Sequence, residues 1–251
     1  TIVAGGKASP TLLAVSESWN GSAWTETLDL NDARETLFLS GADNTAALAA
    51  GGETPGFTGN TELWNGSSWS EQNNLSTARG NAGMTGTSAA ALAFGGSTGS
   101  ASALMEEWTT TQPVGAWATT TSLNSGRYYL ASSNSGPSTD LIAFGGSDGT
   151  NRAYTEKWNG SAWSEVADLT TARQALAGAG TSTSALGFGG NPNTGKTEEW
   201  NNTSWSEKAD LNTARNALGG IGSNAEGALG FGGTPPGALA QTESWNGTSW
   251  S

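Results

Sequence analysis

The chain contains no cysteine and no histidine among its 251 residues, and only 13% of its residues are charged. Without cysteine it forms no disulfide and offers no thiolate to a metal. The absence of both residue types also removes the Ser-His and Cys-His nucleophile systems and the usual zinc ligands. We therefore predict that the chain is not an enzyme, has no catalytic or metal-binding residues and holds no cofactor.

Basic residues and long apolar runs are scarce as well. Lysine and arginine number 10 against 22 acidic residues, which gives a formal charge of −12, and no Lys/Arg cluster is present to neutralise phosphates. No apolar run approaches the roughly 18 residues of a spanning helix, and no signal-peptide pattern is visible. We expect no nucleic acid partner, no anionic membrane surface as a partner and no membrane insertion.

Glycine (37 residues) and tryptophan (12 residues) are abundant, and both recur with a period. A short apolar run ends in Gly-Gly six times, at Gly5-Gly6, Gly51-Gly52, Gly95-Gly96, Gly145-Gly146, Gly189-Gly190 and Gly232-Gly233. Each run is followed by Glu-x-Trp, at Glu17/Trp19, Glu62/Trp64, Glu106/Trp108, Glu156/Trp158, Glu198/Trp200 and Glu243/Trp245. A second tryptophan follows at Trp24, Trp69, Trp117, Trp163, Trp205 and Trp250. A Leu-x-x-x-Arg element occurs only five times, with its arginine at Arg34, Arg79, Arg127, Arg173 and Arg215.

Each unit predicts four short strands: one opened by the arginine, one running into Gly-Gly, one holding Glu-x-Trp and one holding the second tryptophan. Asn-Gly after the first tryptophan predicts a two-residue type I′ hairpin, because it supplies two positive-φ positions. Trp19 then faces Ser22 and Glu17 faces Trp24, so that Glu17, Trp19 and Trp24 share one face. In the third unit, residues 109–116 separate the tryptophans and predict a longer loop.

Four strands in a unit of about 40 to 50 residues are typical of a β-propeller blade. The double glycine after an apolar strand, the downstream tryptophans and the arginine that opens the next strand resemble the kelch repeat over essentially the whole chain. Glu-x-Trp-Asn-Gly stands where kelch repeats usually carry a Tyr-Asp pair. This variant is similar to kelch-type repeats of extracellular bacterial and bacteriophage proteins, including tail-associated ones. Kelch-like propellers include galactose oxidase, but its copper needs histidine and this chain has none.

We therefore predict an all-β, six-bladed kelch-like β-propeller with four antiparallel strands per blade. A single domain is expected over residues 1–251, with blades at approximately 1–29, 30–74, 75–122, 123–168, 169–210 and 211–251. Because the Leu-x-x-x-Arg element occurs five times, the first blade is predicted to lack its first strand. The alternative is a segment cut from a longer propeller.

The repeated residues have a structural interpretation and a functional one. Two tryptophans per blade can fill the space between neighbouring blades, which explains their recurrence better than carbohydrate stacking. One Glu and one Arg per unit predict a regular ion pair within a blade or between blades, since buried charges must be paired. Six equivalent glutamates also argue against the paired acids of a glycosidase. A glycosidase remains the third functional hypothesis.

Recognition is expected in the loops after Gly-Gly, because these differ in every copy of a repeated scaffold. The sequence does not fix the binding residues, and the candidates in these loops are Phe57, Tyr154 and Pro235. Asp148 lies in such a loop but lacks the spaced acids of a calcium site. Several Asn-x-Ser/Thr sequences are formal glycosylation acceptors, but most coincide with the predicted hairpin turns.

The first functional hypothesis is a non-enzymatic structural or adhesion module that binds a protein or a cell-surface glycan. Its expected place is extracellular or on a virion, such as a phage tail or fibre, as part of a larger assembly. The alternative is an intracellular kelch-type adaptor for protein interactions.

Overall fold

The computed structural model describes residues 1–110, 114–234 and 237–251. The chain there forms 22 β-strands and six antiparallel sheets, and the described part contains no helix and thus none that could cross a membrane. The strands belong to two compact units, Thr1–Ser122 and Leu123–Ser251, with three sheets in each. The division falls at a predicted blade boundary, and the expectation of one domain over the whole chain stays a prediction.

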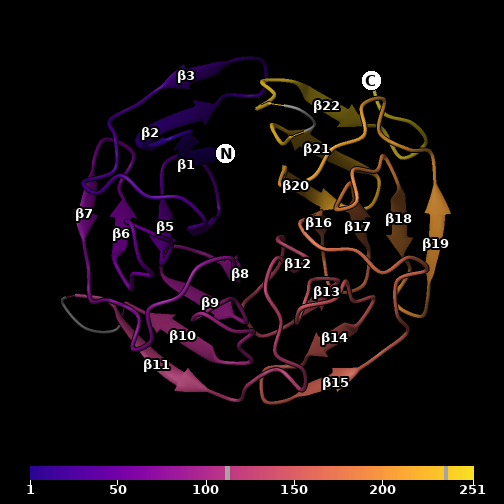
Figure 1. The fold of residues 1–251 in the computed structure, drawn as a ribbon, viewed down its shortest axis with the longest axis horizontal. Coiled ribbons are helices and arrows are strands. Elements are labelled where there is room, and N and C mark those ends of the chain that lie inside the picture. Colours follow the sequence, from indigo (N-terminus) through magenta and orange to yellow (C-terminus); the bar gives the residue numbers. More distant parts are fainter. Residues whose placement is uncertain (111–113, 235–236) are drawn as a thin grey trace. The chain divides into compact units, whose positions relative to one another are not determined.

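The first unit contains blades 1 to 3 (Figure 1). Blade 1 has the strand order β1-β2-β3, blade 2 the order β4-β5-β6-β7 and blade 3 the order β8-β9-β10-β11. The bounds are β1 Ile2–Ala8, β2 Thr11–Trp19, β3 Trp24–Glu26, β4 Phe38–Gly41, β5 Ala47–Ala50, β6 Thr61–Trp64, β7 Trp69–Glu71, β8 Gly83–Gly86, β9 Ala90–Phe94, β10 Met105–Thr109 and β11 Ala116–Thr120.

The second unit contains blades 4 to 6. Blade 4 has the order β12-β13-β14-β15, blade 5 the order β16-β17-β18-β19 and blade 6 the order β20-β21-β22. The bounds are β12 Ala131–Ser132, β13 Leu141–Phe144, β14 Thr155–Trp158, β15 Trp163–Glu165, β16 Ala177–Gly180, β17 Ala185–Phe188, β18 Thr197–Trp200, β19 Trp205–Lys208, β20 Gly219–Asn224, β21 Gly227–Phe231 and β22 Thr242–Trp245. In blade 6 the fourth strand is reduced to the bridge between Trp245 and Trp250.

Six small antiparallel sheets of three or four strands are the blades of a six-bladed β-propeller, so the predicted fold class is confirmed. Blade 1 has three strands, and these correspond in sequence to the second, third and fourth strands of blade 2. The predicted absence of its first strand is therefore confirmed as well.

The core of each unit lies between adjacent sheets, as the tryptophan pattern predicts. In the first unit, Ile2 and Ala4 of blade 1 cluster with Trp64 and Trp69 of blade 2. In the second unit, the ring of Phe144 in blade 4 packs 4.7 Å from the ring of Trp205 in blade 5, measured between centroids. Strands such as β5 are buried on both faces, because a neighbouring sheet covers each side.

The arginine does not open the first strand of each blade, which corrects the sequence interpretation. In blade 2, β4 begins four residues after Arg34, and in blade 5, β16 begins four residues after Arg173. The intervening segment turns at a residue with positive φ, as at Thr36 (56°). The equivalent residues are Asn81, Tyr129, Ala175 and Ala217, with φ between 51° and 58°.

The predicted two-residue hairpin is also wrong. Trp19 pairs with Trp24 rather than Ser22, and Glu17 pairs with Glu26 rather than Trp24. Residues 20–23 form the loop, in which Gly21 has positive φ (105°), while Asn20 is not among the positive-φ residues. The Oδ1 atom of Asn20 instead accepts hydrogen bonds from the backbone N–H groups of residues 22 and 23. The prediction that Glu17, Trp19 and Trp24 share one face is confirmed. Glu17 and Trp19 are two residues apart in one strand, and Trp19 lies directly opposite Trp24 in the sheet.

The longer hairpin loop predicted between Trp108 and Trp117 of blade 3 is confirmed. Trp108 pairs with Trp117, as in the other hairpins, and the ladder continues one step further to the pair of Thr109 and Ala116. The loop between these last two residues includes residues 111–113, which lie outside the described residues. The hairpin of blade 3 therefore keeps the Trp–Trp register of the repeat and extends its strands beyond it.

Candidate binding site

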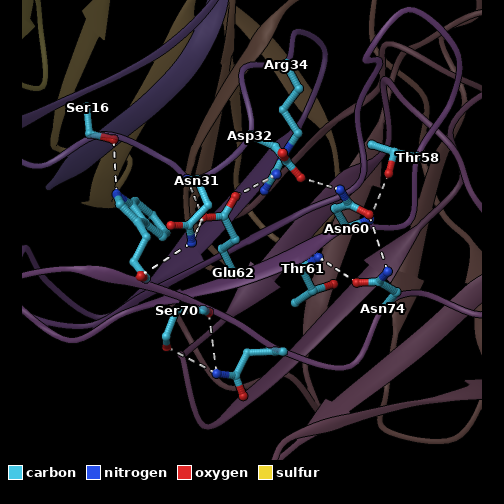
Figure 2. A network of polar contacts seen from close by, with 12 residues as sticks. Ser16, Asn31, Asp32, Arg34, Thr58, Asn60, Thr61, Glu62, Ser70 and Asn74 are labelled. Carbon is cyan, nitrogen blue, oxygen red and sulfur yellow. Dashed lines mark hydrogen bonds and ion pairs between the residues drawn. The ribbon is translucent and has the colours of Figure 1, made fainter.

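The repeated glutamates and arginines form buried ion pairs within single blades, which confirms the predicted pairing. The Nη1 atom of Arg34 lies 2.7 Å from Oε1 of Glu62, and both side chains are almost fully buried (Figure 2). The other pairs are Arg79–Glu106, Arg127–Glu156, Arg173–Glu198 (2.5 Å) and Arg215–Glu243 (2.9 Å).

The second oxygen of each glutamate has its own partner, which sequence reasoning missed. Oε2 of Glu62 accepts a hydrogen bond from the backbone N–H of Asn31 at 2.8 Å (Figure 2). The same bond recurs from Ser76 to Glu106, Asn124 to Glu156, Thr170 to Glu198 and Asn212 to Glu243, at 2.6 to 2.7 Å. In every case the donor directly follows the leucine of Leu-x-x-x-Arg. That element therefore binds both carboxylate oxygens, through a guanidinium and a backbone N–H.

Electrostatics favour the charged form of Glu106. Burial raises the pKa of Glu106, but hydrogen bonds from Arg79 and Ser76 outweigh it, so that the pKa lies below its usual range. Each of the five buried glutamates is bound to an arginine of its own blade. This arrangement has the character of a structural ion pair and differs from that of two acids flanking a substrate.

The tryptophans of blades 2 to 6 are buried, apart from the half-buried Trp117. The two indoles of each blade pack against each other in a tilted arrangement, with centroids 5.4 to 5.6 Å apart. Nε1 of the second tryptophan donates to a hydroxyl of the preceding blade at four junctions. The pairs are Trp69 to Ser16, Trp117 to Thr61, Trp205 to Thr155 and Trp250 to Thr197, at 3.0 to 3.1 Å. The recurring Ser/Thr before Glu-x-Trp was the sequence signal for this bond.

Trp108 shows most clearly that the first tryptophan of a blade is a packing residue. Its side chain is fully buried (0% exposed), and it clusters with Phe38 and Leu48 of blade 2. Its Nε1 donates to the backbone oxygen of Ser88 at 3.0 Å. Trp200 of blade 5 is 1% exposed and makes the equivalent bond to Ser182. A ring enclosed in this way cannot stack on a sugar, so the carbohydrate-stacking interpretation does not apply to these tryptophans.

The variable loop of blade 4 leaves the side chain of Tyr154 accessible. Tyr154 is 38% exposed, and the guanidinium of Arg152 lies over its ring, 5.4 Å from the centroid. Arg152 also binds Asp148, at 3.0 Å from Nε to Oδ1 and 2.9 Å from Nη2 to Oδ2. Phe57 is half-buried in blade 2, and Pro235 lies outside the described residues. Of the two loop candidates that the structure describes, Tyr154 is the one in a polar surface cluster.

All three tyrosines of the chain belong to blade 4, which sequence reasoning did not single out. Tyr128 and Tyr129 pack edge to face with centroids 5.4 Å apart, and Tyr129 is 39% exposed. The backbone of Tyr128 exchanges two hydrogen bonds with Ser147, at the start of the loop that also carries Asp148 and Arg152. Backbone pairing thus joins the segment that contains Tyr128 and Tyr129 to the loop that leads to Tyr154.

The polar surface continues from blade 4 into blade 5. Nδ2 of Asn151 donates to the backbone oxygen of Asn191 at 2.8 Å, and the N–H of Asn191 donates to the backbone oxygen of Gln174. Oε1 of Gln174 is buried with no hydrogen-bond partner in the described structure. We call the surface formed by Tyr128, Tyr129, Asp148, Asn151, Arg152, Tyr154, Gln174 and Asn191 the tyrosine patch.

A further polar residue that sequence reasoning missed is Asn134 in blade 4. Its Nδ2 donates to the backbone oxygens of Gly178 in blade 5 and Gly220 in blade 6, at 2.9 and 2.7 Å. The side chain ties the three blades of the second unit together. Its sequence surroundings differ from those of the repeat, so no periodic signal identified it.

No family model and no curated protein matches the chain in sequence. Among solved structures, the chain is similar to that of the protein YjhT, with a TM-score of 0.74 and 12% sequence identity. The likeness covers 92% of this chain and 88% of that chain. At this identity it supports the propeller fold alone.

Proposed function

We propose that the chain is a non-enzymatic binding module that recognises a cell-surface glycan through the tyrosine patch. We further propose that its repeats are of the kelch type and that it acts outside the cell or on a virion, as an adhesion module of a phage tail or fibre. The observation that carries the proposal is that the repeated charged residues and the tyrosines occupy different environments. Five of the six repeated acids and all five repeated arginines are bound in buried pairs, whereas all three tyrosines gather in one blade beside exposed polar loops.

The chemistry of the tyrosine patch suits a neutral sugar. Exposed aromatic rings pack against the apolar C–H faces of a sugar, while amides and a fixed Asp–Arg pair supply hydrogen-bond donors and acceptors for its hydroxyls. A few polar groups placed among aromatic side chains are typical of small-molecule sites. The formal charge of −12 disfavours acidic ligands over long range.

A glycan array probed with residues 1–251 tests the proposal, with Tyr129→Ala and Tyr154→Ala as variants. Tyr129→Ala is suited to this test because alanine occupies the same positive-φ position at Ala175 and Ala217. We expect the wild type to retain neutral glycans and each variant to lose about tenfold in affinity, the equivalent of one stacked ring.

The matched control is Leu28→Ala, which removes an exposed apolar side chain from blade 1. It should bind as the wild type does. Failure of the wild type to retain any glycan, or equal retention by wild type and both tyrosine variants, contradicts the proposal.

A further inference from the structure

Blade 1 presents an open sheet edge where the other blades have a paired strand. In its order β1-β2-β3 (Figure 1), β1 corresponds to β5 of blade 2, which pairs with β4 on one side and β6 on the other. β1 pairs with β2 alone, in a regular antiparallel register from Ile2 to Ala4. An edge strand of this kind is a template for another extended segment.

Glu17 of blade 1 also differs from the equivalent glutamates of the other five blades. It is exposed, whereas Glu62, Glu106, Glu156 and Glu198 are at most 1% exposed and Glu243 is 7% exposed. Within the described residues Glu17 has no ion pair and its carboxylate has no hydrogen-bond donor, although its strand position matches that of Glu62. In the complete blades the partners of this acid come from the Leu-x-x-x-Arg element that precedes the first strand.

Blade 1 retains the acceptor groups that bind the arginine in other blades. In blades 3 to 6, Nη2 of the arginine also donates to the backbone oxygen of the residue that faces the glutamate across the sheet, at 3.1 to 3.4 Å. In blade 1 that residue is Val3, which pairs with Glu17. A carboxylate and a backbone oxygen thus stand where a guanidinium binds in the other blades.

Trp19 also differs from its equivalents in other blades. In blades 2, 3, 5 and 6, Nε1 of the first tryptophan donates to a backbone oxygen in the loop between the first and second strands, as from Trp64 to Asn44 at 3.0 Å. Trp19 is half-buried, and its Nε1 has no acceptor in the described structure. The loop that would supply the acceptor follows the strand that blade 1 lacks.

We propose that the open edge of β1 binds an extended polypeptide segment with the pattern Leu-(Asn/Ser/Thr)-x-(Ala/Gly)-Arg followed by a short strand. The arginine pairs with Glu17, the N–H after the leucine donates to the other oxygen of Glu17, and the strand pairs antiparallel with β1. The occupant is a segment of the repeat's own type, since all five copies in the chain have this pattern and make these contacts. This inference concerns a different blade from the tyrosine patch and does not depend on the proposed glycan binding.

The probe is a synthetic peptide with the sequence of residues 167–182, which contains Leu169, Arg173 and β16. It is titrated into the protein of residues 1–251, and the affinity is measured by calorimetry and the protection of β1 amides by hydrogen exchange. We expect binding, slower exchange at Ile2–Ala4, and a loss of about tenfold or more when the peptide carries R173Q, because a charge-assisted hydrogen bond is removed.

Protein variants then place the peptide at Glu17. Glu17→Gln should lower the affinity for the arginine peptide by more than it lowers the affinity for the R173Q peptide, and this difference in a double-mutant cycle measures the direct pair. Glu26→Gln, which removes the exposed acid opposite Glu17, is the matched control and should have little effect. No binding, equal binding of the two peptides, or protection of β17 instead of β1 would overturn the proposal.

Discussion

Blades 1 and 2 have the same markers, the same hairpin register and the same indole geometry, yet they differ in burial. The tryptophan rings are 5.4 Å apart and inclined at 45° in both blades, and both hairpins pair tryptophan with tryptophan. Glu62 is 1% exposed and bound to Arg34, while Glu17 is exposed. The hairpin is therefore set by local sequence, whereas the buried acid depends on an arginine 28 residues away in sequence.

The largest difference in stability between blades 1 and 2 is expected when the glutamate before the first tryptophan is replaced. Glu62→Gln leaves the guanidinium of Arg34 buried without its counter-charge, and breaking such a pair from one side costs about 3–5 kcal/mol. Glu17→Gln changes an exposed residue and should stay within about 0.5 kcal/mol of the wild type. Urea denaturation of both variants measures the contrast.

Glu71→Gln is the control for this prediction, because Glu71 is exposed and faces Glu62 across the sheet. It should behave like Glu17→Gln. Similar losses for Glu62→Gln and Glu17→Gln would show that the buried pair does not distinguish the blades.

A smaller difference between the buried glutamates and Glu17 is expected in the way stability depends on low pH. The pKa of Glu106 is lowered in the folded protein, although burial alone would raise it, because Arg79 and Ser76 hold its charged form. A lowered pKa contributes stability that is present above the unfolded value of 4.5 and is lost as the pH falls through the folded value. Glu106→Gln should therefore weaken the acid dependence of stability below about pH 4.5.

Melting temperatures recorded from pH 7 down to pH 3 test this prediction. Glu17→Gln in blade 1 and Glu107→Gln, an exposed neighbour of Glu106, should both retain the acid profile of the wild type. An unchanged profile in Glu106→Gln would show that the buried pairs do not control acid unfolding.

The sequence was sufficient for the features that repeat. Glycine pairs, tryptophans and the Glu/Arg series predict the blade count, the buried ion pairs and the missing strand of blade 1, because each marker has the same structural role in blades 2 to 6. The backbone N–H that donates to the second glutamate oxygen was not predicted, because any residue type can supply a backbone N–H. Its side chain varies, from Asn31 to Ser76 to Thr170.

The features that sequence did not predict depend on contacts between blades or on competing local chemistry. Positive φ at Tyr129 and Ala175 has no local signal, and it is accompanied by a backbone hydrogen bond from Ala175 to Tyr129 across the blade junction. The Asn-Gly pair suggested a two-residue turn, but the Oδ1 of Asn20 binds two following N–H groups and sets a longer loop. The tyrosine patch gathers residues from separate loops, so it became visible only in the folded chain.

The smallest loss of stability is expected at the hairpin turns, where blades 1 and 2 should respond equally. Asn20→Ala and Asn65→Ala each remove an Oδ1 that accepts two backbone N–H groups at 2.9 Å, with the same geometry in both blades. These bonds are exposed, so each substitution should cost about 1 kcal/mol in urea denaturation. Asn65→Asp keeps the acceptor and should retain most of the stability. Because the turn uses only its own residues, the two alanine variants should lose the same amount. A markedly smaller loss at Asn20 would show that the turn of blade 1 is already weakened by the absent strand, and that hairpin geometry is less local than the shared register implies.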